Sequence, residues 1–87
     1  MESLFNSRRR LAETSLHLPT FGMGTAHLGE LYSTVDESVS HATLEAAWAG
    51  GVRYFDTAAW YGRGLAEHRL GGVLRPKPRN DFFISTK

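Results

Sequence analysis

The chain has 87 residues, of which 41% are hydrophobic and 22% charged, with a formal net charge of +1 and no cysteine. This composition is typical of a globular domain that can bury an apolar core, and it excludes disulfides. No apolar run approaches the roughly 20 residues of a membrane span. The run Arg8–Arg10 stands in a nearly neutral chain and makes no basic face for nucleic acid, and the polar residues 12–15 that follow it do not resemble an export signal. We therefore expect a cytoplasmic protein with neither a membrane nor a nucleic acid as its partner.

The first half of the chain predicts a hairpin, a strand and a helix. Residues 8–18 alternate loosely, as in a small hairpin, and residues 20–24 form a candidate strand. A helix is expected to begin between residues 33 and 36, where acidic side chains favour the helix dipole, and to end at the two glycines 50–51. Its expected apolar stripe consists of Val39, Ala42, Ala46 and Ala49, with Leu44 and Trp48 beside it.

The second half predicts a β-α-β unit. Residues 52–55 and 81–86 are rich in β-branched and aromatic side chains, as in buried strands. Residues 64–74 between them predict a helix, followed by a loop over 75–80 that contains two prolines. The expected apolar face of this helix consists of Ala66, Leu70, Val73 and Leu74. Two strands joined by such a crossover lie parallel and usually adjacent.

A spacing of 31 residues separates Thr25 from Asp56 and Asp56 from Lys87, each at the end of a candidate strand. A (β/α)₈ barrel of about 250 residues gives each unit roughly 31, and its active sites lie at the carboxyl ends of the strands. A doubly wound sheet shares the β-α-β order but should carry G-x-G-x-x-G after its first strand. That fingerprint is absent, because His27 and Glu67 stand where the last glycine belongs. We therefore expect an α/β fold that forms the opening hairpin and about three strands of a (β/α)₈ barrel.

Three titratable side chains are expected to meet at the carboxyl edge of this sheet. Asp56 closes one strand, Tyr61 follows five positions later, and Lys87 closes the next strand. Each has a plain interpretation when taken alone: a turn residue, a packed loop aromatic and a solvated terminus. Their joint spacing on one edge favours a functional site.

Three separated segments resemble the aldo-keto reductases, barrel enzymes that move a hydride between a carbonyl or alcohol and a nicotinamide cofactor. Residues 22–25 (GMGT) resemble the end of the family's first barrel strand, residues 55–62 (FDTAAWYG) its signature, and residues 84–87 (ISTK) its catalytic lysine strand. Within the family, residues 24–29 and 61–71 are most similar to the branch of D-threo-aldose (fucose) and pyridoxal dehydrogenases.

The resemblance implies an NAD- or NADP-dependent oxidoreductase whose catalytic residues are Asp56, Tyr61 and Lys87. It also places Gly24, Thr25 and Asp56 beside the cofactor. A free tyrosine, with a pKa of about 10, is a poor base at neutral pH, and a nearby ammonium stabilises its phenolate. Lys87 would supply that ammonium, Asp56 would hold it, and Tyr61 would exchange a proton with the substrate. The branch implies an aldose, a cyclic hemiacetal or an aldehyde as substrate.

Other candidate residues carry weaker signals. Trp60 is a candidate wall of the substrate pocket, although a packed loop aromatic fits it equally well. His27 follows the first strand end and could face the same pocket. No two of the four histidines have the i, i+4 spacing of helical zinc ligands, so we expect no metal site.

The length leaves the expected barrel incomplete. Residues 1–87 form one domain with at most three of eight barrel strands, without the family's later catalytic histidine and phosphate-binding loops. An open parallel sheet exposes both edges and one face. We therefore expect this polypeptide alone to be inactive and marginally stable. The alternative is a non-catalytic fragment that acts through partner strands.

Overall fold

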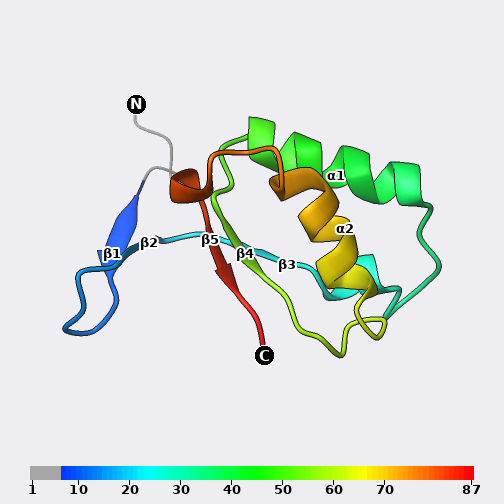
Figure 1. Ribbon diagram of the computed structural model, residues 1–87, viewed down its shortest axis with the longest axis horizontal. Helices are drawn as coiled ribbons and strands as arrows, with labels where there is room; N and C mark the ends of the chain where they lie inside the picture. Colours follow the sequence, from blue (N-terminus) through cyan, green and yellow to red (C-terminus); the bar gives the residue numbers. More distant parts are fainter. Residues whose placement is uncertain (1–6) are drawn as a thin grey trace.

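The computed structural model describes residues 7–87 as two small sheets with two α-helices (Figure 1). The strands are β1 (Arg8–Arg10), β2 (His17–Pro19), β3 (Met23–Gly24), β4 (Tyr54–Asp56) and β5 (Phe83–Ser85). The helices are α1 (Glu37–Ala49) and α2 (Leu65–Leu74), with short 3-10 helices at η2 (Ala26–Gly29) and η3 (Arg79–Asp81). Because β3, β4 and β5 are parallel neighbours in that order, the predicted β-α-β connection is confirmed. Each of the three strands is shorter than the run that predicted it.

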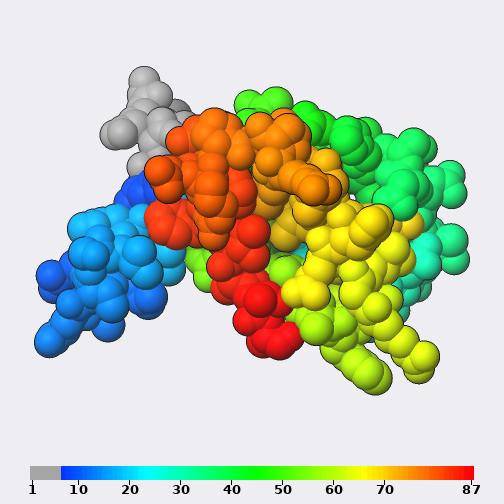
Figure 2. All heavy atoms as spheres, in the orientation of Figure 1, coloured from blue at the N-terminus to red at the C-terminus, as the bar shows by residue number. Residues whose placement is uncertain are grey.

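The hairpin expected over residues 8–18 is present, with β1 antiparallel to β2. Its turn is closed by Thr14, whose hydroxyl donates to the carbonyl of Leu11 at 2.6 Å. The guanidinium of Arg8 lies 5.5 Å from the ring centroid of Phe83, the first residue of β5. The hairpin therefore contacts the amino end of the parallel sheet, and it stands out from the body of the molecule in Figure 2.

Helix α1 begins at Glu37 and ends at Ala49, close to the expected bounds, but it buries a different side. Leu44 is 1% exposed, whereas Val39 is 53% exposed. The predicted stripe of Val39, Ala42, Ala46 and Ala49 is therefore wrong, since the three alanines are exposed as well. Alanine adds little apolar area, so the larger side chains of Leu44 and the half-buried Trp48 determine which side of α1 faces the core.

Helix α2 buries the face that its sequence predicts. Ala66, Leu70, Val73 and Leu74 are all at most 3% exposed. They pack in one cluster with Phe55 of β4, which is fully buried, and with Leu28, Leu44, Val52 and Phe82. Figure 1 shows α1 and α2 on the same side of the sheet. Because successive strand residues point to opposite faces, Phe55 faces the helices while Tyr54 and Asp56 face away from them.

One buried arginine connects segments that are distant in the sequence. Arg69 of α2 is 9% exposed, and its guanidinium donates to the carbonyls of Leu28 and Val35, each at 2.9 Å. Its Nε also lies 3.3 Å from a carboxylate oxygen of Glu37. The second helix thereby satisfies backbone groups of η2 and of the loop that enters α1.

Candidate active site

The side chains of Asp56 and Lys87 form an ion pair at the carboxyl edge of the parallel sheet. Asp56 is the last residue of β4, and Lys87 lies two residues after the end of β5. Lys87 Nζ is 2.8 Å from Asp56 Oδ2 and 3.4 Å from the carbonyl oxygen of Thr57. The predicted contact between the two strand ends is confirmed.

The second oxygen of the Asp56 carboxylate has its own donor. Ser85 Oγ donates to Asp56 Oδ1 at 2.5 Å, and the hydroxyl of Tyr54 donates to Ser85 Oγ at 3.2 Å. The hydrogen bonds from Lys87 and then from Ser85 hold the pKa of Asp56 below its ordinary value of 3.8. The hydrogen bond to Asp56 in turn raises the pKa of Lys87 above 10.5, with a smaller contribution from Tyr61. Both groups therefore stay charged at neutral pH.

Tyr61 lies in the loop between β4 and α2, where the backbone is closely held. Its N–H donates to the carbonyl of Ala58 at 3.2 Å, and its carbonyl accepts from the N–H of Ala66 at 3.2 Å. Gly29 of η2 packs so tightly against this loop that an added Cβ would lie 2.5 Å from the carbonyl carbon of Tyr61. Lys87 Nζ is 5.5 Å from the centroid of the Tyr61 ring. The lysine therefore lies between the aspartate and the tyrosine, and Figure 2 shows the red end of the chain beside this yellow-green loop.

The end of β3 completes the edge on the other side of Asp56. Thr25 is fully buried, and both its hydroxyl and its N–H donate to the Asp56 carbonyl, at 2.9 and 3.0 Å. Gly24, which pairs with Asp56 across the ladder, has no atom within 4 Å of the position that a Cβ would occupy. Thr25 thus fixes the backbone of Asp56, and Gly24 leaves open space above the sheet.

An open hollow of about 340 Å³ adjoins this edge. It lies on the sheet face that carries Asp56, and its lining residues are Pro19, Thr20, Gly22, Met23, Gly24, Tyr54 and Asp56. The two glycines contribute no side chains, so a flat group could approach the backbone of β3 beside the carboxylate.

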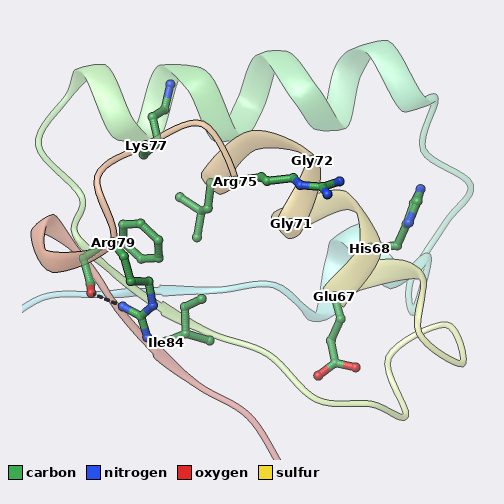
Figure 3. Close-up of a pocket in the computed structure, with 10 residues that line it drawn as sticks. Glu67, His68, Gly71, Gly72, Arg75, Lys77, Arg79 and Ile84 are labelled. Atoms are coloured by element: carbon green, nitrogen blue, oxygen red, sulfur yellow. Dashed lines mark hydrogen bonds between the residues drawn. The ribbon is translucent and has the colours of Figure 1, made fainter.

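A larger hollow, of about 460 Å³, lies on the other face of the sheet (Figure 3). It combines an apolar floor that includes Phe82 and Ile84 with the cationic side chains of Arg75, Lys77 and Arg79. Lys77 is paired with Glu45, and Arg79 donates to the carbonyl of Phe82. None of the three side chains at the carboxyl edge lines this hollow, so its size does not make it the candidate active site.

The two residues predicted for the substrate pocket differ in their exposure. Trp60 is 78% exposed, with the guanidinium of Arg63 6.0 Å from its ring centroid. His27 is half-buried in η2. No hydrogen bond or ion pair among the residues described in this structure joins either side chain to Asp56 or Lys87.

Residues 7–87 lack two further features. This part of the chain contains no group of three or more histidine, cysteine, aspartate or glutamate side chains that could hold a metal ion. It also contains no helix that is both long and apolar enough to cross a membrane.

Ser85 and Tyr54 also belong to this hydrogen-bonded group, although the sequence did not point to them. The available signal was strand alternation: Tyr54 stands two residues before Asp56, and Ser85 stands two residues before Lys87, so each shares a face with a predicted site residue. Serine and tyrosine are common on the polar faces of strands, which is why alternation alone did not identify them.

Comparison with known proteins identifies the family of this chain. The profile of the Aldo/keto reductase family matches residues 20–87. The D-threo-aldose 1-dehydrogenase of a Pseudomonas species is 47% identical over 76 residues, which cover 87% of this chain and 23% of that protein. The pyridoxal 4-dehydrogenase of Microbacterium luteolum is 48% identical over 82 residues, covering 94% of this chain and 24% of that protein.

A solved structure shows the same fold. The holo form of an aldo-keto reductase from Bacillus halodurans superposes with a TM-score of 0.77 at 29% identity, over 91% of this chain and 24% of that one. The chain thus spans about a quarter of the length of these relatives. The predicted fold, the opening hairpin and strands of a (β/α)₈ barrel, is confirmed. Since the family profile spans most of the sequence, the chain belongs to the Aldo/keto reductase family.

Proposed function

We propose that this chain supplies the proton-transfer group of an NAD- or NADP-dependent oxidoreductase that acts on an aldose, a cyclic hemiacetal or an aldehyde. The observation that carries the proposal is the position of Lys87, which pairs with Asp56 at 2.8 Å and lies 5.5 Å from the ring centroid of Tyr61. The substrate class is supported by the names of the relatives, D-threo-aldose 1-dehydrogenase and pyridoxal 4-dehydrogenase.

In this proposal Tyr61 exchanges the proton. It accepts the hydroxyl proton of an alcohol or hemiacetal in the direction of oxidation, and donates a proton to a carbonyl oxygen in the direction of reduction. The ammonium of Lys87 stabilises the negative charge that develops on the phenol oxygen. Asp56 holds the ammonium in place, and Thr25 holds the backbone of Asp56.

The hollow beside Asp56 suits a flat cofactor ring. Gly24 exposes the backbone of β3 there, since a Cβ on Gly24 would have no neighbour within 4 Å. We propose that Gly24 and Asp56 line the cofactor side of the site, with Thr25 supporting them from beneath. A bound nicotinamide would supply or accept the hydride. Trp60 and His27 stay candidates for contacts to the substrate.

The test is a kinetic comparison of Tyr61→Phe with the unaltered protein, in the form that its source cell produces. Oxidation of D-threo-aldoses and of pyridoxal is followed by the absorbance of the reduced nicotinamide. Loss of a general acid or base lowers kcat by about 10² to 10⁴-fold. Tyr32→Phe is the matched control, because Tyr32 is 80% exposed. Equal kcat values for both variants would contradict the role of Tyr61.

The alternative is a non-catalytic role in which partner strands add to the sheet. It is favoured by one observation: within the described residues, β3 and β5 each pair on one side only. The ion pair at the carboxyl edge favours the enzymatic role, because the addition of partner strands to the sheet would not require an ion pair there. We expect the isolated polypeptide of residues 1–87 to show no turnover with NAD or NADP. Turnover by that purified polypeptide would contradict this expectation.

A further inference from the structure

We propose that Ser85 is a positioning residue for the Asp56–Lys87 ion pair, with Tyr54 fixing the direction of its hydroxyl. The inference rests on the proposed function for its kinetic consequence, although the hydrogen-bond chain itself does not. Three bonds follow one another along the open face of the sheet. Tyr54 donates to Ser85 at 3.2 Å, Ser85 donates to Asp56 Oδ1 at 2.5 Å, and Lys87 donates to Asp56 Oδ2 at 2.8 Å.

The ion pair needs such support because it is open to solvent. The side chains of Lys87 and Asp56 are 59% and 44% exposed. Exposed pairs of this kind contribute little by themselves, because each long side chain loses rotational freedom when it is held in one geometry. A free carboxylate can turn about its terminal torsion and offer either oxygen, or neither, to the ammonium. The bond from Ser85 removes that freedom by holding Oδ1, so that Oδ2 points toward Lys87.

The backbone places Ser85 where this bond can form. Asp56 and Ser85 are direct ladder partners on the adjacent strands β4 and β5. Their side chains rise from the same face of the sheet about 4.8 Å apart, so a short hydroxyl side chain reaches the carboxylate. An O–H···O⁻ bond of 2.5 Å falls within the short distances typical of charge-assisted hydrogen bonds.

Tyr54 gives the serine hydroxyl its direction. A serine hydroxyl has one hydrogen and two acceptor sites. Because Tyr54 donates to Ser85 Oγ, it occupies an acceptor site and leaves the serine hydrogen for Asp56. The ladder pairs Tyr54 with Phe83 and Asp56 with Ser85, so both polar side chains of β4 lie on the same face as Ser85. The chain of bonds thus runs from a half-buried tyrosine to the reactive edge.

The test compares Ser85→Ala, Ser85→Thr and Tyr54→Phe with the unaltered protein, in the form that its source cell produces. The first readout is the pKa of the Asp56 carboxyl, from a carbon-13 NMR titration. The groups facing it are Lys87 and, beyond Lys87, Tyr61. We expect the pKa of Asp56 to rise in Ser85→Ala, to rise by less in Tyr54→Phe, and to be preserved in Ser85→Thr, which keeps the hydroxyl.

The second readout is kinetic. Losing a hydrogen bond to a charged group is expected to lower kcat of Ser85→Ala about tenfold. KM should stay unchanged in Ser85→Ala. In Ser85→Thr, which keeps the hydroxyl, kcat should equal that of the unaltered protein. Ser40→Ala is the matched control, because Ser40 Oγ is buried in α1 without a hydrogen-bond partner and lies outside the site. It should leave both readouts unchanged.

The two proposals fail in different ways. An unchanged pKa of Asp56 in both Ser85→Ala and Tyr54→Phe overturns the positioning role, whether or not the protein is an oxidoreductase. A raised pKa in a protein that never oxidises the test substrates supports the positioning role and contradicts the proposed function. If Ser85→Ala does not fold, the Asp56 pKa in Tyr54→Phe tests the positioning role instead. Tyr54→Phe removes only one hydroxyl, at the partly exposed end of the chain of bonds.

Discussion

Lys87 and Asp56 are joined at 2.8 Å across the ends of two parallel strands, although 31 residues separate them in the sequence. This contact raises the pKa of Lys87 and lowers the pKa of Asp56, in both cases mainly through the hydrogen bond that they share. The ion pair is therefore intact at neutral pH and is lost only in strongly acidic or strongly alkaline solution.

The pH dependence of the ion pair follows from those two directions. A lowered carboxylate pKa stabilises the folded state above the ordinary value of 3.8 and ceases to do so as the pH falls through the lowered pKa. A raised ammonium pKa stabilises it below 10.5 and ceases to do so as the pH rises through the raised pKa. In Lys87→Met we expect an NMR titration to show the Asp56 pKa returning toward 3.8. Glu13→Gln, on the exposed hairpin turn, should leave it unchanged. An Asp56 pKa insensitive to the loss of Lys87 would show that the bond does not persist in solution.

Gly24→Val tests the open hollow beside Asp56. The new side chain would enter free space, since no atom lies within 4 Å of its Cβ, so the fold should be retained. A cofactor ring approaching β3 would collide with it, and we expect NAD or NADP to bind at least tenfold more weakly. Isothermal titration gives the Kd, with Gly71→Ala on the open side of α2 as control. Unaltered cofactor binding in Gly24→Val would place the cofactor elsewhere.

Gly29→Ala tests how η2 holds the tyrosine loop. Its Cβ would lie 2.5 Å from the carbonyl carbon of Tyr61 and 2.8 Å from the nitrogen of Gly62, so the backbone must shift. Overpacking of this kind costs about 1–3 kcal/mol. We expect chemical denaturation to show that loss, together with reduced kcat because Tyr61 moves. Gly72→Ala, in an open helical position, should be neutral or stabilising. Unchanged stability in Gly29→Ala would mean that η2 and the loop that carries Tyr61 are less closely packed.

Arg69→Met removes the buried guanidinium. The carbonyls of Leu28 and Val35 would lose their donors, and the buried carbonyl of Leu28 alone would cost about 1–3 kcal/mol when left unsatisfied. We expect a lower free energy of unfolding in denaturant titrations. Arg75→Met, at the exposed carboxyl end of α2, is the charge-matched control and should change stability little. Equal effects of the two changes would argue against a structural role for Arg69.

The sequence predicted which residues meet at the carboxyl edge of the sheet, but it did not predict the register of the strands. Equal spacing predicted that Thr25, Asp56 and Lys87 lie at one edge, and both Thr25 and Lys87 bond to Asp56. The residues directly opposite Asp56 in the ladder, however, are Gly24 and Ser85. Strand register depends on packing between the strands and helices, which spacing does not encode. The long side chain of Lys87 and the hydroxyl of Thr25 bridge the difference.

Other features depended on contacts that no local pattern contains. The prediction of the buried side of α1 was wrong because it relied on alanines, which add little apolar area. The side that carries Leu44 faces the core instead. Arg69 looks like a solvated helix residue in the sequence, yet its acceptors are backbone carbonyls 41 and 34 residues away. The helix α2, with larger apolar side chains at regular spacing, was predicted correctly.

The position of Arg69 has a consequence for how this segment can be divided. Its guanidinium belongs to the second βα unit, while the carbonyls and the carboxylate that it contacts belong to the first. Separating the two units, as in domain shuffling, would leave a buried cation in one piece and acceptors without their donor in the other. The two units are therefore expected to be exchanged among related barrels as a single module.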